Sequence, residues 1–186
     1  MKQSKKILIA NRGVIAIRAL RAARELGYSV ASVYSTIDRD QKHLKLSDEA
    51  ICIGPPETKD SYLNEAAIIS AAELSGADAI YPGFGFLAEN ASFAEKCRES
   101  GFKFIGPDPE VIAIMGDKIK AKELAKSLNI PVVPGYEGEI SNENEAIKIV
   151  EEIGYPVIIK ASAGGGGRGM RAVSYTHLRA HETAYY

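Results

Sequence analysis

Apolar residues in the first hundred positions follow two alternating patterns. Short, mainly apolar runs occupy residues 6–10, 30–34, 50–53, 79–81 and 103–105. Such runs are typical of strands that are buried on both faces of a parallel sheet. Apolar residues at helical spacing cover residues 14–26, 61–75 and 89–100, and a glycine follows each segment. These segments predict helices, the second capped by Ser61, and the alternation predicts an α/β fold with a doubly wound parallel sheet.

Proline and glycine then divide the chain. Gly106-Pro107-Asp108-Pro109 is the strongest break in the pattern. We therefore expect a first domain over residues 1–107, a helical linker over 108–130 and a second, incomplete domain over 131–173. Within the second domain the pattern predicts an edge strand at Val132–Val133, a helix over 142–153, and strands over 157–161 and 170–173.

The last segment, residues 174–186, has a different character. It contains His177 and His181 and has no apolar period. Two histidines four residues apart on a helix can face one metal ion, but the H-E-x-x-H order of a zinc protease is absent. The segment resembles translated sequencing-adapter sequence, so we expect a non-native tail here and native sequence up to Val173.

Composition adds mainly exclusions. Hydrophobic residues make up 46% and charged residues 25% of the 186 residues, and the net charge is −1, which is ordinary for a globular protein. The near-neutral charge gives no reason to expect a nucleic acid or an anionic membrane as partner. No apolar run approaches the roughly 18 residues of a membrane span. We expect a cytoplasmic protein in which Cys52 and Cys97 are small buried residues, rather than metal ligands or a disulfide.

The first candidate for chemistry is a glycine-rich loop between two predicted strands. It consists of Gly164, Gly165, Gly166, Gly167, Arg168 and Gly169, and Met170 opens the next strand. Glycine reaches positive φ freely and lets backbone N–H groups approach an anion. A flexible connection is the alternative interpretation, but the flanking strands and the nearby positive charges favour a lid over phosphate groups.

This loop is not a Walker phosphate loop, because no lysine follows the glycines and the next segment is β-like. Lysines for the phosphates must therefore come from elsewhere in the chain. Lys160 ends the strand before the loop, and Lys118 follows Met115-Gly116-Asp117 at a helix start. A lysine ammonium is a compact charge suited to phosphate oxygens, so both lysines are candidate phosphate ligands.

Separated motifs, in the family's order, resemble the biotin carboxylase family and most closely its bacterial acetyl-CoA carboxylase subunits. The motifs are Ala10–Gly13, Asp60–Asn64, Pro82–Asn90, Phe104–Pro107, Met115–Lys118 and Gly154–Met170. The resemblance runs from about Lys6 to Val173. It implies a pre-ATP-grasp, Rossmann-like N-terminal domain followed by an ATP-grasp lid domain that is incomplete in this sequence.

The resemblance also implies an activity. The family uses MgATP to activate bicarbonate and carboxylates biotin on a biotin carboxyl carrier protein, which then serves carboxyltransferase subunits. ATP and Mg²⁺ are thus the implied cofactors, and carrier-bound biotin is the implied substrate. The resemblance implies that Lys118 and Lys160 hold ATP phosphates while the glycine loop closes over them.

Two further sets of residues take their roles from the resemblance. Phe84 and Gly85 correspond to the biotin and bicarbonate side of the cleft. The turns at 11–13 and 82–86 each follow a predicted parallel strand, which places both in the crevice where α/β folds bind ligands. The positions corresponding to a homodimer interface are Arg18, Arg21 and Glu25.

The sequence departs from the family pattern at Val14, Tyr81, Phe84 and Ala163, and the changes at Tyr81 and Phe84 affect the biotin side. The family's metal-binding glutamates, catalytic base and biotin-side arginine lie beyond the position of Val173. We therefore expect no catalytic residue and no metal ligand in this sequence, and an inactive fragment.

Other functions stay open. The parent could be the first domain of a pyruvate, propionyl-CoA or urea carboxylase, and the sequence that follows the carboxylase domain would distinguish these. Alternatively, the chain is a non-catalytic nucleotide-binding or dimerisation module. Asn11-Arg12-Gly13 stands where a dinucleotide-binding turn has G-x-G-x-x-G, which weakens that interpretation.

Overall fold

The computed structural model describes residues 5–133, 135–136, 140–160 and 170–173, with the backbone alone at residues 143, 160, 170 and 171. Contacts between residues divide the chain into two compact units, Met1–Ala113 and Ile114–Tyr186. The glycine loop at 164–169 and the expected tail at 174–186 lie outside the described residues. The expected domain limits at residues 107, 130 and 173 stay predictions.

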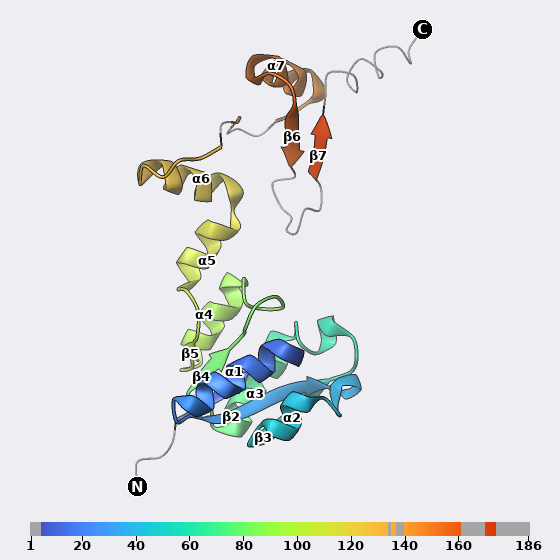
Figure 1. The fold of residues 1–186 in the computed structure, drawn as a ribbon, viewed down its shortest axis with the longest axis vertical. Helices are drawn as coiled ribbons and strands as arrows, with labels where there is room; N and C mark the ends of the chain where they lie inside the picture. Colours follow the sequence, from blue (N-terminus) through green and yellow to red (C-terminus); the bar gives the residue numbers. More distant parts are fainter. Residues whose placement is uncertain (1–4, 134, 137–139, 161–169, 174–186) are drawn as a thin grey trace. The chain divides into compact units, whose positions relative to one another are not determined.

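The first unit is built on one sheet of five strands (Figure 1). The strands are β1 (Lys6–Ile9), β2 (Ser29–Ser35), β3 (Glu49–Gly54), β4 (Ala79–Tyr81) and β5 (Lys103–Phe104), in the order β3-β2-β1-β4-β5. β1 is central, with Ile9 opposite Ser32 of β2 on one side and Tyr81 of β4 on the other. All four strand pairs are parallel, which confirms the predicted sheet.

Helices connect these strands. The first unit contains α1 (Gly13–Glu25), α2 (Lys42–Leu46), α3 (Glu65–Ser75) and α4 (Ala91–Glu99), with the 3-10 turns η1 (Thr36–Asp38) and η2 (Thr58–Asp60). The sequence predicts α1, α3 and α4 from their apolar periodicity. It does not predict α2, η1 or η2, which are too short to show a helical period.

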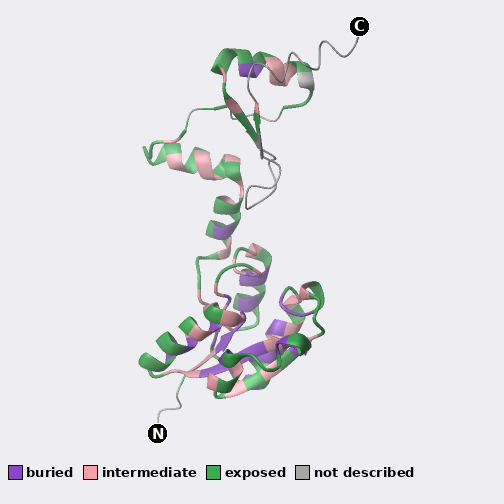
Figure 2. Ribbon diagram, turned by 45° about the vertical axis from the view of Figure 1, so that its right-hand side comes forward, coloured by how far each residue is buried: buried purple, intermediate pink, exposed green. Residues whose placement is uncertain are grey.

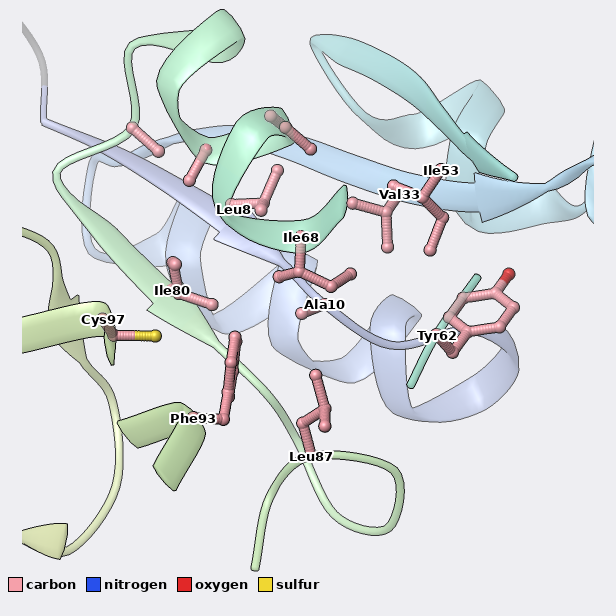
Figure 3. Close-up of a cluster of buried hydrophobic side chains, with 14 residues drawn as sticks. Leu8, Ala10, Val33, Ile53, Tyr62, Ile68, Ile80, Leu87, Phe93 and Cys97 are labelled. Carbon is pink, nitrogen blue, oxygen red and sulfur yellow. The ribbon is translucent and has the colours of Figure 1, made fainter. Parts of the chain in front are cut away.

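Apolar side chains cover both faces of the sheet, because successive residues of a strand point to opposite faces. Leu8 and Ala10 of the β1 segment lie in the larger cluster with Ile68 of α3 and Phe93 of α4 (Figure 3). Ile9 lies in the second cluster, whose buried helical residues are Ala16, Leu20 and Ala23 of α1. The sheet is therefore doubly wound, with α1 on one face and α3 and α4 on the other.

Asparagine, rather than serine, begins two of these helices. α3 follows Asn64, whose side-chain oxygen accepts a hydrogen bond from the amide of Ala67 at 3.1 Å. The prediction that Ser61 caps this helix is wrong, because the Ser61 hydroxyl donates to the carbonyl of Glu57 at 2.8 Å. Asn90 caps α4 through the amide of Phe93 at 2.9 Å, so both helices begin with a satisfied donor in their first turn.

The predicted helical linker consists of two helices. α5 (Pro109–Gly116) crosses the division between the units, and α6 (Lys118–Ser127) follows it. Asp117 separates them, because its carboxylate accepts from the amides of Ile119 and Lys120 at 3.0 and 3.2 Å and so caps α6. The predicted edge strand at Val132–Val133 is wrong. These residues belong to no strand, and each neighbouring proline lacks the N–H that a strand ladder needs.

The other elements of the second unit are α7 (Glu143–Ile153), β6 (Val157–Lys160) and β7 (Met170–Val173). They confirm the helix and the two strands predicted there. β6 and β7 pair in the antiparallel direction, with Lys160 opposite Met170. Within the described part of this unit, Ile149 and Val150 of α7 are the buried residues (Figure 2), so this described part has little core of its own.

Candidate functional site

Asn11 joins the turn after β1 to the loop after β4. It is buried, with 1% of its surface exposed. Its Nδ2 donates to the carbonyl oxygen of Pro82 at 2.8 Å and to that of Phe84 at 3.0 Å. Its Oδ1 accepts from the amide of Arg12 at 2.8 Å. Both N–H groups of the side chain are thus used, and they hold the two turns together at the carboxyl edge of the sheet.

The loop of residues 82–86 bends tightly beside Asn11. Gly83, Gly85 and Phe86 have positive φ angles of 71°, 74° and 44°. Glycine adopts such angles readily, whereas a phenylalanine at positive φ is uncommon. A Cβ on Gly83 would lie 2.7 Å from the side chain of Ile15 and 2.8 Å from Nδ2 of Asn11. Position 83 therefore requires glycine for both its angle and its space.

A buried carboxylate ties the turn after β1 to the end of β2. Asp38 of η1 is 4% exposed. Its Oδ2 accepts from three donors, which are Nη1 of Arg12 at 3.0 Å, the hydroxyl of Tyr62 at 2.7 Å and the hydroxyl of Ser35 at 3.0 Å. Its Oδ1 accepts from Nε2 of Gln41 at 3.0 Å. The donors satisfy the charge, which makes its burial tolerable.

These contacts set the protonation states of the cluster. Burial alone would raise the pKa of Asp38, but the hydrogen bonds from Tyr62, Arg12 and Ser35 and the charge of Arg12 outweigh burial and lower that pKa. Burial, and then the hydrogen bond to Asp38, raise the pKa of the Tyr62 hydroxyl. At neutral pH the carboxylate accepts and the hydroxyl donates, so neither group is suited to proton transfer there.

Two aromatic rings complete the cluster. Tyr62 and Phe86 stack with ring centroids 4.9 Å apart and planes inclined by 13°. The guanidinium carbon of Arg12 lies 5.3 Å from the Tyr62 centroid and 5.6 Å from the Phe86 centroid, within the range of a cation–π attraction. Arg12 therefore links the buried carboxylate to the loop that follows β4.

The predicted substrate-side residues, Phe84 and Gly85, lie in the middle of this loop. Phe84 is exposed, with 73% of the residue surface accessible. Its backbone carbonyl oxygen nevertheless accepts a hydrogen bond from Asn11. Gly85 is also exposed. An exposed aromatic side chain on a fixed loop can contact an apolar ligand face. Its contact with biotin stays a prediction.

The predicted phosphate residues belong to the second unit. Lys118 is the first residue of α6 and is exposed, which confirms its place at a helix start. Lys160 ends β6 opposite Met170. The glycine loop thus joins two neighbouring antiparallel strands and does not open a helix, unlike a Walker loop. The loop itself and the Lys160 side chain lie outside the described residues, so their phosphate roles stay predictions.

The predicted dimer residues Arg18, Arg21 and Glu25 are exposed on α1. Their three- and four-residue spacing places them on the side of the helix opposite the buried residues Ala16, Leu20 and Ala23. They are therefore accessible to a partner, and their role in a dimer stays a prediction.

Asp38, the centre of the cluster, and its donors Ser35 and Gln41 are not identified by the sequence analysis. Asp38 lies three residues beyond β2, in a segment without apolar periodicity. The position of Asp38 in the sequence could have identified it. A carboxylate that follows the carboxyl end of a strand beside β1 reaches the same edge of the sheet as Asn11.

The described residues also bear on two other possibilities, a group of metal ligands and a membrane-spanning helix. Among them no group of three or more His, Cys, Asp or Glu side chains could hold a metal ion, and no helix is both long and apolar enough to cross a bilayer. Cys97 is buried, as predicted, and burial followed by the charge of Glu65 raises its pKa to about 12. The predicted burial of Cys52 is wrong, because β3 lies at an edge of the sheet.

Comparison with known proteins covers both units. Residues 3–112 match the family model described as "Biotin carboxylase, N-terminal domain". Residues 117–182 match "Carbamoyl-phosphate synthase L chain, ATP binding domain". The biotin carboxylase of Pseudomonas aeruginosa is 57% identical over 169 residues, which are 90% of this chain and 38% of the relative. The chain therefore spans well under half the length of the curated relatives it matches.

Solved structures extend the similarity. A biotin carboxylase complex with β-γ-ATP from Campylobacter jejuni gives a TM-score of 0.90 at 50% identity, over 97% of this chain and 41% of that one. The biotin carboxylase domain dimer of Hydrogenobacter thermophilus 2-oxoglutarate carboxylase, in complex with MgADP, ADP and bicarbonate, gives 0.88 at 48% identity, over 100% and 41%. Both similarities extend over nearly all or all of this chain and less than half of the other.

Proposed function

The chain belongs to the biotin carboxylase family, and from this membership we propose that it forms the N-terminal part of an ATP-dependent biotin carboxylase. The proposed reaction carboxylates biotin on its carrier protein with bicarbonate, while MgATP becomes ADP and phosphate. The observation that carries the proposal is that the similarity spans both units, from the turn after β1 to the β6–β7 hairpin. We assign the full protein to the cytoplasm, as the subunit that supplies carboxybiotin to the carboxyltransferase of an acetyl-CoA carboxylase.

The residues of the second unit are suited to binding a nucleoside triphosphate. Lys118 is an exposed residue in the first turn of α6, and the segment between β6 and β7 contains five glycines and one arginine. In the proposal, Lys118 and Lys160 hold phosphate oxygens and the amides of Gly164–Gly169 cover them. Bound MgATP supplies the phosphoryl group that activates bicarbonate, and the covering loop keeps water away.

The first unit supplies the substrate side and the dimer contact in this proposal. Phe84 and Gly85 contact the biotin ring system from the loop after β4, whose position Asn11 fixes through two hydrogen bonds. Arg18, Arg21 and Glu25 form an isologous interface in the full-length homodimer, where each basic residue can meet the acidic residue of a second copy.

A chimera tests the function. Residues 1–173 replace the corresponding segment of the Pseudomonas aeruginosa relative, and ATP-dependent carboxylation of free biotin is measured. We expect turnover, and we expect Lys118→Met and Lys160→Met each to lower kcat/KM for ATP about 10- to 100-fold, because a charge-assisted hydrogen bond contributes about 1.5–3 kcal/mol.

Lys120→Met is the matched control in the chimera. Lys120 is an exposed lysine of the same helix, two residues beyond Lys118, and lies 3.9 Å from Asp117. Its replacement should change kcat/KM by less than about twofold, since surface pairs contribute little. Loss of biotin-dependent turnover in the chimera, with the parent relative active, would exclude the proposed function.

We also propose that the 186-residue chain alone does not turn over ATP. The family's metal-binding glutamates, catalytic base and biotin-side arginine correspond to positions beyond Val173. A bicarbonate-dependent ATPase rate above that of a Lys118→Met variant of the same chain would contradict this part of the proposal.

The similarity to the biotin carboxylase domain of a 2-oxoglutarate carboxylase favours one alternative parent. In that case, the same first half-reaction would serve a different acceptor, such as a keto acid or another acyl-CoA. Sequencing the locus beyond residue 173 distinguishes the two, because a fused transferase or carrier segment would indicate a multidomain carboxylase.

A further inference from the structure

The loop of residues 82–86 is fixed by contacts that extend beyond the residues assigned to the substrate side. We propose that Arg12 is a positioning residue for this loop, and that with Asn11 it sets the conformation in which Phe84 and Gly85 meet the substrate. This inference rests on the proposed function, because Phe84 and Gly85 contact biotin only in that proposal.

The conformation of the loop is unfavourable by itself. Phe86 has a φ of 44° and directly follows Gly85, the second left-handed glycine of the same loop. A non-glycine residue in this region is strained, and it persists only where the surrounding structure holds it. Such strain is concentrated at sites where a ligand must find a preformed surface. The contacts that hold Phe86 are therefore the ones to identify.

Two sets of contacts hold the loop, and both meet at residue 12. The main chain of the loop is held by Asn11, whose Oδ1 is in turn oriented by the amide of Arg12 at 2.8 Å. The ring of Phe86 is held against Tyr62 at 4.9 Å, with the Arg12 guanidinium near both rings. Asp38 accepts from both Arg12 and Tyr62, so it fixes the two groups that hold the ring.

Arginine is suited to this position in a way that lysine is not. Its planar guanidinium can lie against aromatic faces while one N–H group donates to a carboxylate, whereas a lysine ammonium is a point charge. The Arg12 side chain is 41% exposed while that of Asp38 is 6% exposed. Arg12 therefore lies at the surface end of the cluster, where a change can release the loop and leave the apolar core intact.

Order parameters from ¹⁵N relaxation of the 186-residue chain test this directly. In the parent chain we expect Gly83, Gly85 and Phe86 to give values near about 0.85, as in rigid strands. Arg12→Lys keeps the backbone amide that orients Asn11 but removes the guanidinium beside the Phe86 ring, so it should lower the value of Phe86 below about 0.6. The matched control is Arg24→Lys. Arg24 lies in the last turn of α1, the helix that Arg12 precedes. Its side chain is 46% exposed and forms a 3.0 Å ion pair with Asp48, beside β2. This control should leave the loop values unchanged.

The chimera adds a kinetic readout. Arg12→Lys should raise KM for biotin about tenfold and leave KM for ATP within about twofold, because the proposed phosphate residues belong to the other unit. Arg24→Lys should change neither constant. A merely structural role for Arg12 would lower the active fraction of enzyme and leave both KM values unchanged, which would overturn the proposal.

If Arg12→Lys does not fold, Tyr62→Phe is the variant that tests whether the Asp38 cluster fixes the loop. It preserves the ring that stacks on Phe86 and removes the hydroxyl that donates to Asp38. We expect the same direction of change in the loop order parameters. Unchanged values in the folded variant would overturn the proposal. A chimera that does not carboxylate biotin would instead refute the proposed function, while the order parameters would still decide whether Arg12 fixes the loop.

Discussion

The two units of the chain differ in how much of their apolar surface they cover. The first has helices on both faces of five parallel strands and buries both clusters. The second has a two-stranded sheet, in which Ile158 and Ile159 of β6 are 59% and 43% exposed on opposite faces. A two-stranded sheet is marginal by itself. We therefore expect the first unit to be stable by itself and the second to depend on further contacts for stability.

The largest expected effect comes from the core of the first unit. Phe93 is fully buried and packs edge-on against Phe104 at 6.1 Å. Phe93→Ala should lower the free energy of unfolding of this unit by about 3–5 kcal/mol, measured by urea unfolding followed by circular dichroism. Ile149→Ala in α7 is the comparison, and should leave the unfolding of the first unit unchanged. An equal loss from both variants would show that the units unfold together.

A second prediction concerns acid stability. The lowered pKa of Asp38 means that the folded state binds fewer protons here than the unfolded state, whose value is near 3.8. The contribution to stability is therefore present above about pH 4 and is lost as the pH falls through the folded pKa. Asp38→Asn should destabilise the first unit by about 1.5–3 kcal/mol at pH 7.

The difference between parent and Asp38→Asn should shrink as the pH falls below about 4, because the parent then loses the same charge. Urea unfolding at several pH values measures it. A constant difference between pH 7 and pH 2.5 would show that the charge of Asp38 contributes no stability.

The carboxyl edge of the first unit gives the third prediction. Gly83→Ala should cost about 1–3 kcal/mol, because the added Cβ meets both Ile15 and Asn11 and the φ of 71° disfavours any side chain. Gly76→Ala, with φ of 62° and nothing within 4 Å of its Cβ, should cost only about 1 kcal/mol. Equal thermal shifts would show that the contact with Asn11 is easily relieved.

The smallest expected effect comes from removing a helix cap, and it tests most directly whether the two units unfold separately. Asn64 caps α3 and Asn142 caps α7, with acceptor distances of 3.1 and 2.9 Å. Replacing either by alanine should cost about 1 kcal/mol. Asn64→Ala should raise hydrogen exchange throughout the first unit, whereas Asn142→Ala should raise it in α7 alone. Faster hydrogen exchange in β1 of the Asn142→Ala variant would show that the two units are not independent in stability.

The strands and the three longer helices of the first unit were predictable, because burial on both faces leaves continuous apolar runs in the strands and a clear period in helices of this length. The short elements α2, η1 and η2 were not. The helix starts were less predictable. Ser61 and Asn64 are both good caps, and only the structure shows that the Ser61 hydroxyl is already engaged by Glu57. The cluster around Asp38 was hidden for a similar reason, because its donors lie far apart in sequence. They come from the turn after β1, the end of β2, the residue before α2 and the turn that follows η2.

The candidate site was predictable where motif and topology coincide. Asn11 and Phe84 follow strands that the alternation predicts to be parallel, so their common edge could be inferred before their contact. The orientation of the Asn11 side-chain amide and the left-handed φ of Phe86 could not be inferred from the sequence, because both depend on side chains packed against them. The edge strand at Val132–Val133 failed because apolar residues alone do not make a strand without partners to pair with.

The central place of β1 bears on the order of events during synthesis. Ile9 pairs with Tyr81, so about 70 residues must be added after β1 before its second neighbour exists. At about 5–20 residues per second that takes on the order of 4–14 seconds, during which one side of the first strand offers unpaired backbone groups to any other chain. The nascent protein is thus most vulnerable to misassociation before β4 emerges, even though β1 ends in the most protected position of the sheet.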